Sequence, residues 1–267
     1  MLLDLQAHGA PEGRATARSQ NFTIERLCGA PGQVFPFASR TEIILLLPTT
    51  GATLTGDRQA DLPDHAIAIV PAGDYAVAPI AGEIYVLATD RCDAGDDAVN
   101  ANAYAVADAR VRPIGAPYHR TAFPGKIRIH RIEDIVIPPD NGRLRFLQSE
   151  TMSLNWVEYA GVRDRSQLSP HAHADAEQAS LAIEGDFLHH LRTPWGRDAD
   201  AWREDQHLAA GPASVIVIPP DIIHTTEGSG NGRHVLVDVF APPRADFIAR
   251  NWVFNAGEYT AAAEPQA

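Results

Sequence analysis

The chain has 267 residues, with 22 Lys and Arg against 34 Asp and Glu, and a net charge of −12. Because binding of nucleic-acid phosphates needs a concentrated cationic surface, this acidic balance without a basic run argues against a nucleic-acid partner. No stretch of about 18 apolar residues occurs, which argues against a membrane span. The 45% hydrophobic content indicates a globular protein of one large or two ordinary domains.

The N-terminal residues predict little regular structure. They are rich in Gly, Ala, Pro and polar residues, and we expect residues 1–20 to form a loose arm. Asp4 comes early and no basic segment leads, so the pattern is not that of a signal peptide and we expect a cytoplasmic protein. Cys28 and Cys92 are too few for a disulfide framework and indicate inert thiols.

Short apolar runs separated by turn residues then fill most of the sequence, which is typical of strands. The runs that we predict as strands are 22–27, 41–47, 66–70, 83–88, 126–137, 143–149, 152–159 and 234–240, together with the segments on either side of them that carry histidines. Residues 90–124 shift to Ala, Asp, Asn and Pro, which favours a linker with a short helix near 99–107. The tail, which includes Trp252, Phe254 and Tyr259, is expected to pack back on the fold.

Two halves of the sequence share a proline spacing that indicates an internal repeat. Pro63 and Pro71 bracket one apolar run, and Pro212 and Pro220 bracket another at the same separation. In this register Tyr75 falls at the position of His224. The region around Phe22, where a matching pair of histidines would have to lie, contains none, so we expect a first half without a metal site.

Histidines gather in the second half. On a strand, His171 and His173 would present both imidazoles on one face, because side chains alternate with a period of two. His224 follows a Pro-Pro-Asp turn, and a neighbouring antiparallel strand could bring it opposite the pair. The spacing therefore predicts that three imidazoles converge on one ion.

This spacing, with six residues between Gln178 and Gly185 and with His224 four positions after Pro220, resembles the two motifs of the cupin family over residues 157–240. The resemblance implies an all-β fold of two double-stranded β-helix, or jelly-roll, barrels. It also implies one divalent metal in the second barrel, held by His171, His173, Gln178 and His224. Most cupins have Glu where this chain has Gln178. The predicted organisation is a barrel over 20–112 without metal ligands, a linker over 113–125, a metal-binding barrel over 126–245 and a tail over 246–267.

The fourth ligand has two candidates. By strand parity, Gln178 faces the pocket together with Ser180 and Ala182, whereas Glu177 faces away. A carboxylate is the better ligand for a hard cation, so a bulge that swings Glu177 inward stays open as the alternative.

Residues 186–210 form a longer hairpin than their counterpart in the first half, and they include two tryptophans. The hairpin could cover the barrel mouth as a lid or bind a partner subunit. His189 and His190 face opposite ways on a strand, so one of them could enter the cavity as a proton carrier. Glu177, His189, His190 and Arg192 are the candidate catalytic residues, and Arg163 and Arg165 could also hold a carboxylate.

Three neutral imidazoles with open positions suit Fe(II), and Mn(II), Ni(II) and Zn(II) are alternatives. The cupin resemblance makes a dioxygenase acting on a small anionic or aromatic chelating substrate the first functional hypothesis. A Lewis-acid isomerase, lyase or hydrolase acting on a small carbohydrate or acid is the second, and a non-catalytic ligand-binding or sensory protein is the third. We expect a small-molecule substrate and a homodimer, with no membrane or nucleic-acid partner.

Overall fold

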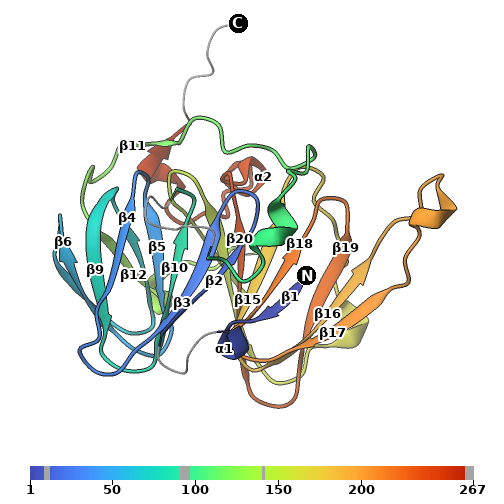
Figure 1. The fold of residues 1–267 in the computed structure, drawn as a ribbon, viewed down its shortest axis with the longest axis horizontal. Helices are drawn as coiled ribbons and strands as arrows, with labels where there is room; N and C mark the ends of the chain where they lie inside the picture. The colour runs from blue at the N-terminus through green and yellow to red at the C-terminus, as the bar shows by residue number, and fades with distance from the viewer. Residues whose placement is uncertain (9–12, 91–96, 140–141, 262–267) are drawn as a thin grey trace, which may run out of the picture.

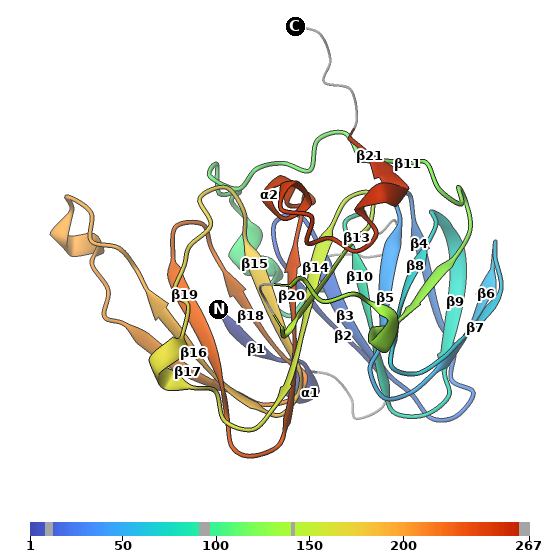
Figure 2. The same ribbon diagram turned by 180° about the vertical axis from the view of Figure 1, so that it is seen from behind.

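A computed structural model describes residues 1–8, 13–90, 97–139 and 142–261. Figure 1 shows two β-barrels side by side, the first in blue to cyan and the second in yellow to orange, and Figure 2 shows them from behind. Nearly all of the regular structure is strand, so the predicted all-β class with two barrels is confirmed. None of the helices in these ranges has the length and apolar composition that crossing a membrane requires.

The first barrel has a six-stranded sheet of order β12-β8-β5-β10-β3-β2 and a four-stranded sheet of order β4-β9-β6-β7. The bounds of these strands are β2 Gly13–Arg18, β3 Thr23–Cys28, β4 Phe35–Ser39, β5 Ile43–Leu47, β6 Ala52–Gly56, β7 Ala60–Leu62, β8 Ala66–Val70, β9 Gly73–Pro79, β10 Glu83–Ala88 and β12 Arg128–Arg131. Buried apolar side chains of both sheets, such as Leu45 and Val77, form one cluster, so the interior of this barrel is a packed core.

The second barrel has a six-stranded sheet of order β1-β18-β15-β20-β14-β13 and a three-stranded sheet of order β17-β16-β19. The bounds of these strands are β1 Leu2–Asp4, β13 Leu144–Gln148, β14 Ser153–Ala160, β15 Gln178–Glu184, β16 Asp186–Arg192, β17 Gln206–Ala210, β18 Ser214–Ile218, β19 Ile223–Ser229 and β20 Arg233–Phe240. The remaining elements are a two-stranded sheet of β11 His119–Arg120 and β21 Tyr259–Thr260, the helices α1 Leu5–His8 and α2 Ala245–Ala249, and the 3-10 helices η1 Ala101–Tyr104, η2 Ile132–Asp134, η3 Arg165–Gln167, η4 Ala199–Ala201 and η5 Ala256–Glu258.

The two six-stranded sheets pack on each other. One buried cluster joins apolar side chains of the first barrel, such as Ile44 and Ile67, to those of the second, such as Trp156, Leu181 and Val237. Side chains on the other face of each sheet fill its own barrel. Strands buried on both faces need apolar residues at every position, which explains why β5 and β8 read as continuous apolar runs without alternation.

The strand orders of the two large sheets correspond position by position, so β8 and β18 are equivalent, as the proline spacing predicted. The pairing nevertheless differs from the predicted boundaries at two points. β1 pairs with β18 of the second barrel, and β12, which the boundaries put in the second barrel, pairs with β8 of the first. Each barrel therefore receives its outer strand from the other part of the chain.

The prediction of a loose N-terminal arm was wrong. Residues 1–8 form β1 and α1, and residues 13–18 form β2, which pairs with β3. Leu3 and Leu5 are buried in the core between the sheets, and Ala15 and Ala17 pack there from β2. The strand pattern of this segment is hard to recognise in the sequence because its side chains are small. Its burial depends on distant residues that pack against it.

The linker and the tail are close to expectation. The helix predicted over 99–107 is the single 3-10 turn η1, and the strand predicted over 126–137 ends early, because η2 follows β12. Cys28 is a free, half-buried thiol, and Cys92 lies outside the described residues. The tail packs back as predicted, since Trp252 stacks on Phe146 with ring centroids 5.4 Å apart.

Candidate metal centre

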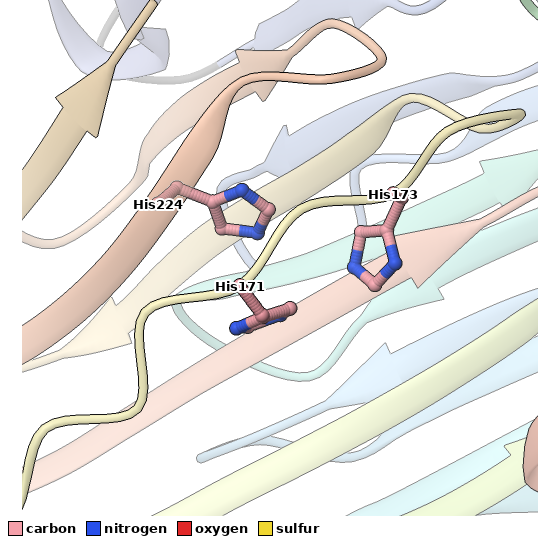
Figure 3. A group of neighbouring side chains, drawn as sticks. All are labelled: His171, His173 and His224. Atoms are coloured by element: carbon pink, nitrogen blue, oxygen red, sulfur yellow. The ribbon is translucent and has the colours of Figure 1, made fainter. Parts of the chain in front are cut away.

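Three histidines converge at one end of the second barrel. The ring nitrogens of His171, His173 and His224 that could bind a metal all lie within 4.8 Å of one another, and Figure 3 shows the three rings gathered around one space. His224 lies at the start of β19, and the backbones of His171 and His224 exchange two hydrogen bonds of 3.0 and 2.8 Å. This pairing brings together residues that are more than fifty positions apart.

The prediction that His171 and His173 lie on a regular strand was wrong. They lie in the segment before β15, where only His171 forms a bridge. In the first barrel the equivalent segment is β4, in which Phe37 pairs with Tyr75 as His171 pairs with His224. Tyr75 is therefore the counterpart of His224, as predicted, but the counterpart of the histidine pair lies near Phe37 and not near Phe22.

Gln178 turns its side-chain oxygen toward the histidines. Its Oε1 lies 3.0 Å from Nε2 of His173 and 3.1 Å from Nε2 of His224. Its amide nitrogen donates to the Ser180 hydroxyl and to a carboxylate oxygen of Asp238, both at 3.0 Å. Because Asp238 can only accept when it is ionised, it fixes the amide with the oxygen toward the rings.

Glu177 faces the other way. Its carboxylate accepts from the backbone N–H of Gln20 at 2.6 Å and from the Tyr104 hydroxyl at 3.1 Å, and burial raises its pKa. The pairing of β15 with β18 runs from Gln178 to Ala182 without a shift, so no bulge turns Glu177 inward. Of the two candidates for the fourth ligand, the structure brings Gln178 to the histidines.

Two of the three histidine rings, those of His173 and His224, are suited to hold a cation because their pKa values are lowered. Burial is the largest cause that lowers the pKa of His173, to about 4, and the positive charge of Arg244 adds to it. Burial likewise lowers the pKa of His224 to about 4. At neutral pH these two imidazoles therefore keep a lone pair, which metal coordination requires.

The cluster opens into a cavity of about 520 Å³. Its aromatic walls and its charged groups come from β14, β16 and β20, from β13 and α2 with their flanking residues, and from the segment before β15. The aromatic residues are Phe146, Tyr159, Phe187, Phe240, Phe247 and Trp252, the arginines are Arg143, Arg163, Arg244 and Arg250, and the carboxylates are Asp238 and Asp246. The cavity therefore combines a candidate metal site with aromatic surface and four positive charges.

Arg163 lines this cavity, as a predicted carboxylate contact would, but the structure separates the other predicted site residues from it. His189 is buried, and its Nδ1 lies 2.8 Å from the Thr226 hydroxyl, but it does not line the cavity, and burial lowers its pKa to about 4. His190 lies on the opposite side of β16, between His207 at 2.7 Å and Glu227 at 3.0 Å. Arg192 is exposed and pairs with Asp205, and Arg165 pairs with Glu227.

Sequence reasoning missed Asp238 and Arg244. Asp238 is the one acidic residue in the apolar run of β20, and a carboxylate at an inward position of a buried strand was a readable signal. Arg244 follows that strand and lies over Phe240, at 5.8 Å from the ring centroid. Its placement depends on the turn before α2, which the sequence does not mark clearly.

The long hairpin does not cover the cavity. The segment between β16 and β17, residues 193–205, forms the tip of the hairpin, and Figure 2 shows this tip projecting from the body of the protein. Trp195 and Trp202 stack at this tip with centroids 4.5 Å apart, and Trp195 is 72% exposed. In this conformation the hairpin is not a lid, whereas its predicted role as an interface stays a prediction.

Replacing Gln178 by Ala should weaken metal retention about tenfold or more, and Glu177→Ala should leave it nearly unchanged. The reason is that only the Gln178 oxygen contacts the two imidazoles. Competition with a chelator would measure both variants, with circular dichroism to verify folding, because Glu177 is buried. The reverse order of effects would make Glu177 the ligand.

Comparison with known proteins gives similarity in structure. No protein-family model matches the sequence, and no curated protein matches it. The structure of an oxalate decarboxylase from Lactobacillus farciminis, in a formate complex, is similar with a TM-score of 0.60 and 13% identity over 91% of this chain and 86% of that chain. A variant of Bacillus subtilis oxalate decarboxylase has a TM-score of 0.60 and 14% identity, over 92% of this chain and 78% of that chain. Hazelnut vicilin, from Corylus avellana, has a TM-score of 0.53 and 12% identity, over 83% of this chain and 76% of that chain. At these identities the similarity concerns the fold.

Proposed function

The chain has the two-barrel cupin fold, and we propose that it is a metal-dependent enzyme whose second barrel holds one divalent ion. His171, His173 and His224, with Gln178, would hold the ion. The fold alone does not carry this proposal, because hazelnut vicilin shares the fold. The observation that carries it is the convergence of three imidazoles and one amide oxygen at the end of a cavity lined by arginines.

Within this class we propose an Fe(II)-type dioxygenase that acts on a small anionic, aromatic, chelating substrate. An Fe(II) ion bound at the site would supply one-electron redox chemistry and open coordination positions. All four protein ligands are neutral, so they leave the charge of the ion uncompensated. That charge favours a substrate that chelates through anionic oxygens.

The cavity walls support an aromatic anion. Phe240, Phe247 and Trp252 offer flat apolar surface in the cavity, and Arg244 lies 5.7 Å from the ring centroid of Phe247. Arginine guanidinium groups pair with carboxylates in a planar, two-point contact. A ring that carries a carboxylate therefore fits both features.

The two carboxylates that line the cavity favour the dioxygenase, because both already bind neighbouring side chains. A Lewis-acid isomerase or hydrolase would need a free base beside the substrate. Asp238 accepts hydrogen bonds from Gln178, from Ser180 at 2.6 Å and from Asn155 at 3.2 Å. Asp246 pairs with Arg244 at 2.9 Å. Both carboxylates that line the described cavity are thus already bound to neighbouring side chains.

The similar structures support a divalent metal without fixing its identity. One of them describes Mn(II) centres in Bacillus subtilis oxalate decarboxylase, with a TM-score of 0.59 and 11% identity over 91% of this chain and 77% of that one. We therefore retain Mn(II), Ni(II) and Zn(II) as alternatives to Fe(II) in the test.

The test is to load the protein separately with Fe(II), Mn(II), Ni(II) and Zn(II) and to measure oxygen uptake with catechols, hydroxy-aromatic acids, β-diketones and uronates. We expect uptake with Fe(II) and an aromatic hydroxy acid or catechol. Conversion without oxygen by the Zn(II) or Mn(II) form would contradict the proposal and favour Lewis-acid chemistry. Tight binding without turnover in any form would favour a sensory protein.

A further inference from the structure

Two neighbouring arginines of the cavity lack acidic partners. Arg143 and Arg163 both line it, and within the described ranges no carboxylate lies at ion-pair distance from either, although the chain carries 34 acidic residues against 22 basic ones. Arg165, in the same loop as Arg163, does pair with a carboxylate, that of Glu227 at 3.1 Å. Arg143 is half-buried, and burial together with the charge of Arg163 lowers its pKa. The Arg163 guanidinium donates to the backbone carbonyl of Gln167 at 3.1 Å, which leaves its charge uncompensated. Two positive charges that line one cavity without an acidic partner favour binding of an anion there.

The position of this pair relative to the histidines follows from β19. The backbone of Gly228 donates to the Tyr159 hydroxyl at 2.8 Å and accepts from the N–H of Arg163 at 3.3 Å, and the Arg143 guanidinium lies 5.8 Å from the Tyr159 ring centroid. Gly228 is four residues beyond His224 on the same strand, which corresponds to roughly 13 Å along the wall.

A second strand gives the same separation. On β14, Asn155 donates to Asp238 beside Gln178, and Tyr159 lies four residues further along. Between the two ends, the wall includes the apolar side chains of Val157 and Leu236 and the hydroxyl-bearing side chains of Thr225 and Thr226. The cavity thus has a candidate metal site at one end, an uncharged middle and a positively charged far end.

We propose that Arg143 and Arg163 form a second anchoring point that binds a carboxylate of the substrate while its chelating oxygens lie at the three histidines. This inference rests on the proposed function and names the substrate class of the same site. The two ends of the cavity wall are roughly 13 Å apart along β19. A metal–ligand bond at one end covers about 2 Å of this length, and a hydrogen bond to arginine at the other covers about 3 Å. Roughly 8 Å then remains between the chelating oxygens and the carboxylate of the substrate. An aromatic chelator whose carboxylate stands on a short side chain has this length.

Binding of a matched set of catechols would test the anchoring point. The set contains 3-(3,4-dihydroxyphenyl)propanoate, its methyl ester and the shorter 3,4-dihydroxybenzoate, and calorimetry with the Zn(II)-loaded protein avoids redox turnover. We expect the propanoate to bind about tenfold more tightly than its ester and more tightly than the benzoate, because an ester cannot form the charged contact with arginine. Equal affinities of acid and ester for the unmodified protein would overturn the inference.

Variants of the two cavity arginines would show which residues cause the preference for the acid over the ester. Arg143→Gln and Arg163→Gln should each reduce the preference for acid over ester to about twofold, because one guanidinium remains in each. Arg203→Gln is the matched control, since Arg203 is exposed, lies outside this cavity and donates to the backbone carbonyls of Asp200 and Trp202. A preference that both cavity variants retain in full would contradict the assignment.

The outcomes separate this inference from the proposed function. If the acid preference depends on Arg143 but the Fe(II) form consumes no oxygen with any compound, the anchoring point stands and the dioxygenase proposal falls. If the Fe(II) form consumes oxygen equally with acid and ester, and Arg143→Gln changes nothing, the dioxygenase stands and the anchoring point falls.

Discussion

Replacement of His224 by Ala should reduce bound divalent metal from about one ion per chain to nearly none. His224 supplies one of three imidazoles, and its Nε2 also contacts the Gln178 oxygen at 3.1 Å. Loss of an outer partner of a metal ligand typically weakens affinity 10–100-fold, and loss of a ligand itself should cost more. Elemental analysis and chelator competition would measure the effect, and His173→Ala should behave in the same way.

His119→Ala is the control for this prediction. His119 is exposed on β11, outside the cavity, and its removal should leave metal content unchanged. Metal content that stays near one per chain in both His173→Ala and His224→Ala would place the metal elsewhere and would remove the basis of the proposed function. Circular dichroism would show whether the variants remain folded, since His224 is buried.

Replacement of Arg120 by Ala should destabilise the fold by about 3–5 kcal/mol, because it would leave the buried carboxylate of Glu42 without its cation. The two groups are 2.6 Å apart, and each side chain is only 6% exposed. The same carboxylate accepts from the Tyr259 hydroxyl at 2.8 Å and from the backbone N–H of Glu150 at 3.1 Å. This cluster therefore joins the first barrel, the tail and the turn between β13 and β14.

Urea denaturation would measure this loss, with Arg192→Ala as the comparison. Arg192 forms a two-point contact with Asp205, but these side chains are 64% and 37% exposed, so solvent screens the pair and its removal should destabilise the fold far less than removal of Arg120. Similar decreases in the free energy of unfolding of Arg120→Ala and Arg192→Ala would contradict the prediction that the buried ion pair matters more than the exposed one. The double variant Arg120→Met with Glu42→Leu should recover much of the stability, since it removes both buried charges.

The strands that the sequence predicted best are those with continuous apolar runs. β8 and β10 have the predicted bounds, because both faces of these strands are buried and their apolar character does not depend on a partner's identity. β1 was missed because three residues carry too little pattern. Its stability comes from pairing with Ser214–Ile216, more than two hundred positions away.

The candidate site was predictable to the extent that it follows strand parity. Gln178 and Glu177 face opposite ways on β15, as alternation requires. The position of Arg192 could not be predicted in this way, because nothing in the sequence shows that Asp205 lies across from it in the hairpin. Arg244 and Phe247 come to the cavity through α2, whose position depends on tertiary packing with Phe146.

The crossing of β1 and β12 between the barrels bears on how the chain folds as it is synthesised. A nascent chain that ends near residue 112 contains most of the first barrel but lacks β12, so the edge of β8 stays unpaired until residue 131 has been made. β1 is made first, yet its partner β18 is among the last strands to appear. A cut within residues 113–125 would leave neither fragment with all the strands of a barrel. We therefore expect both halves to complete their folding together, after synthesis of the second one, and to unfold in a single cooperative transition.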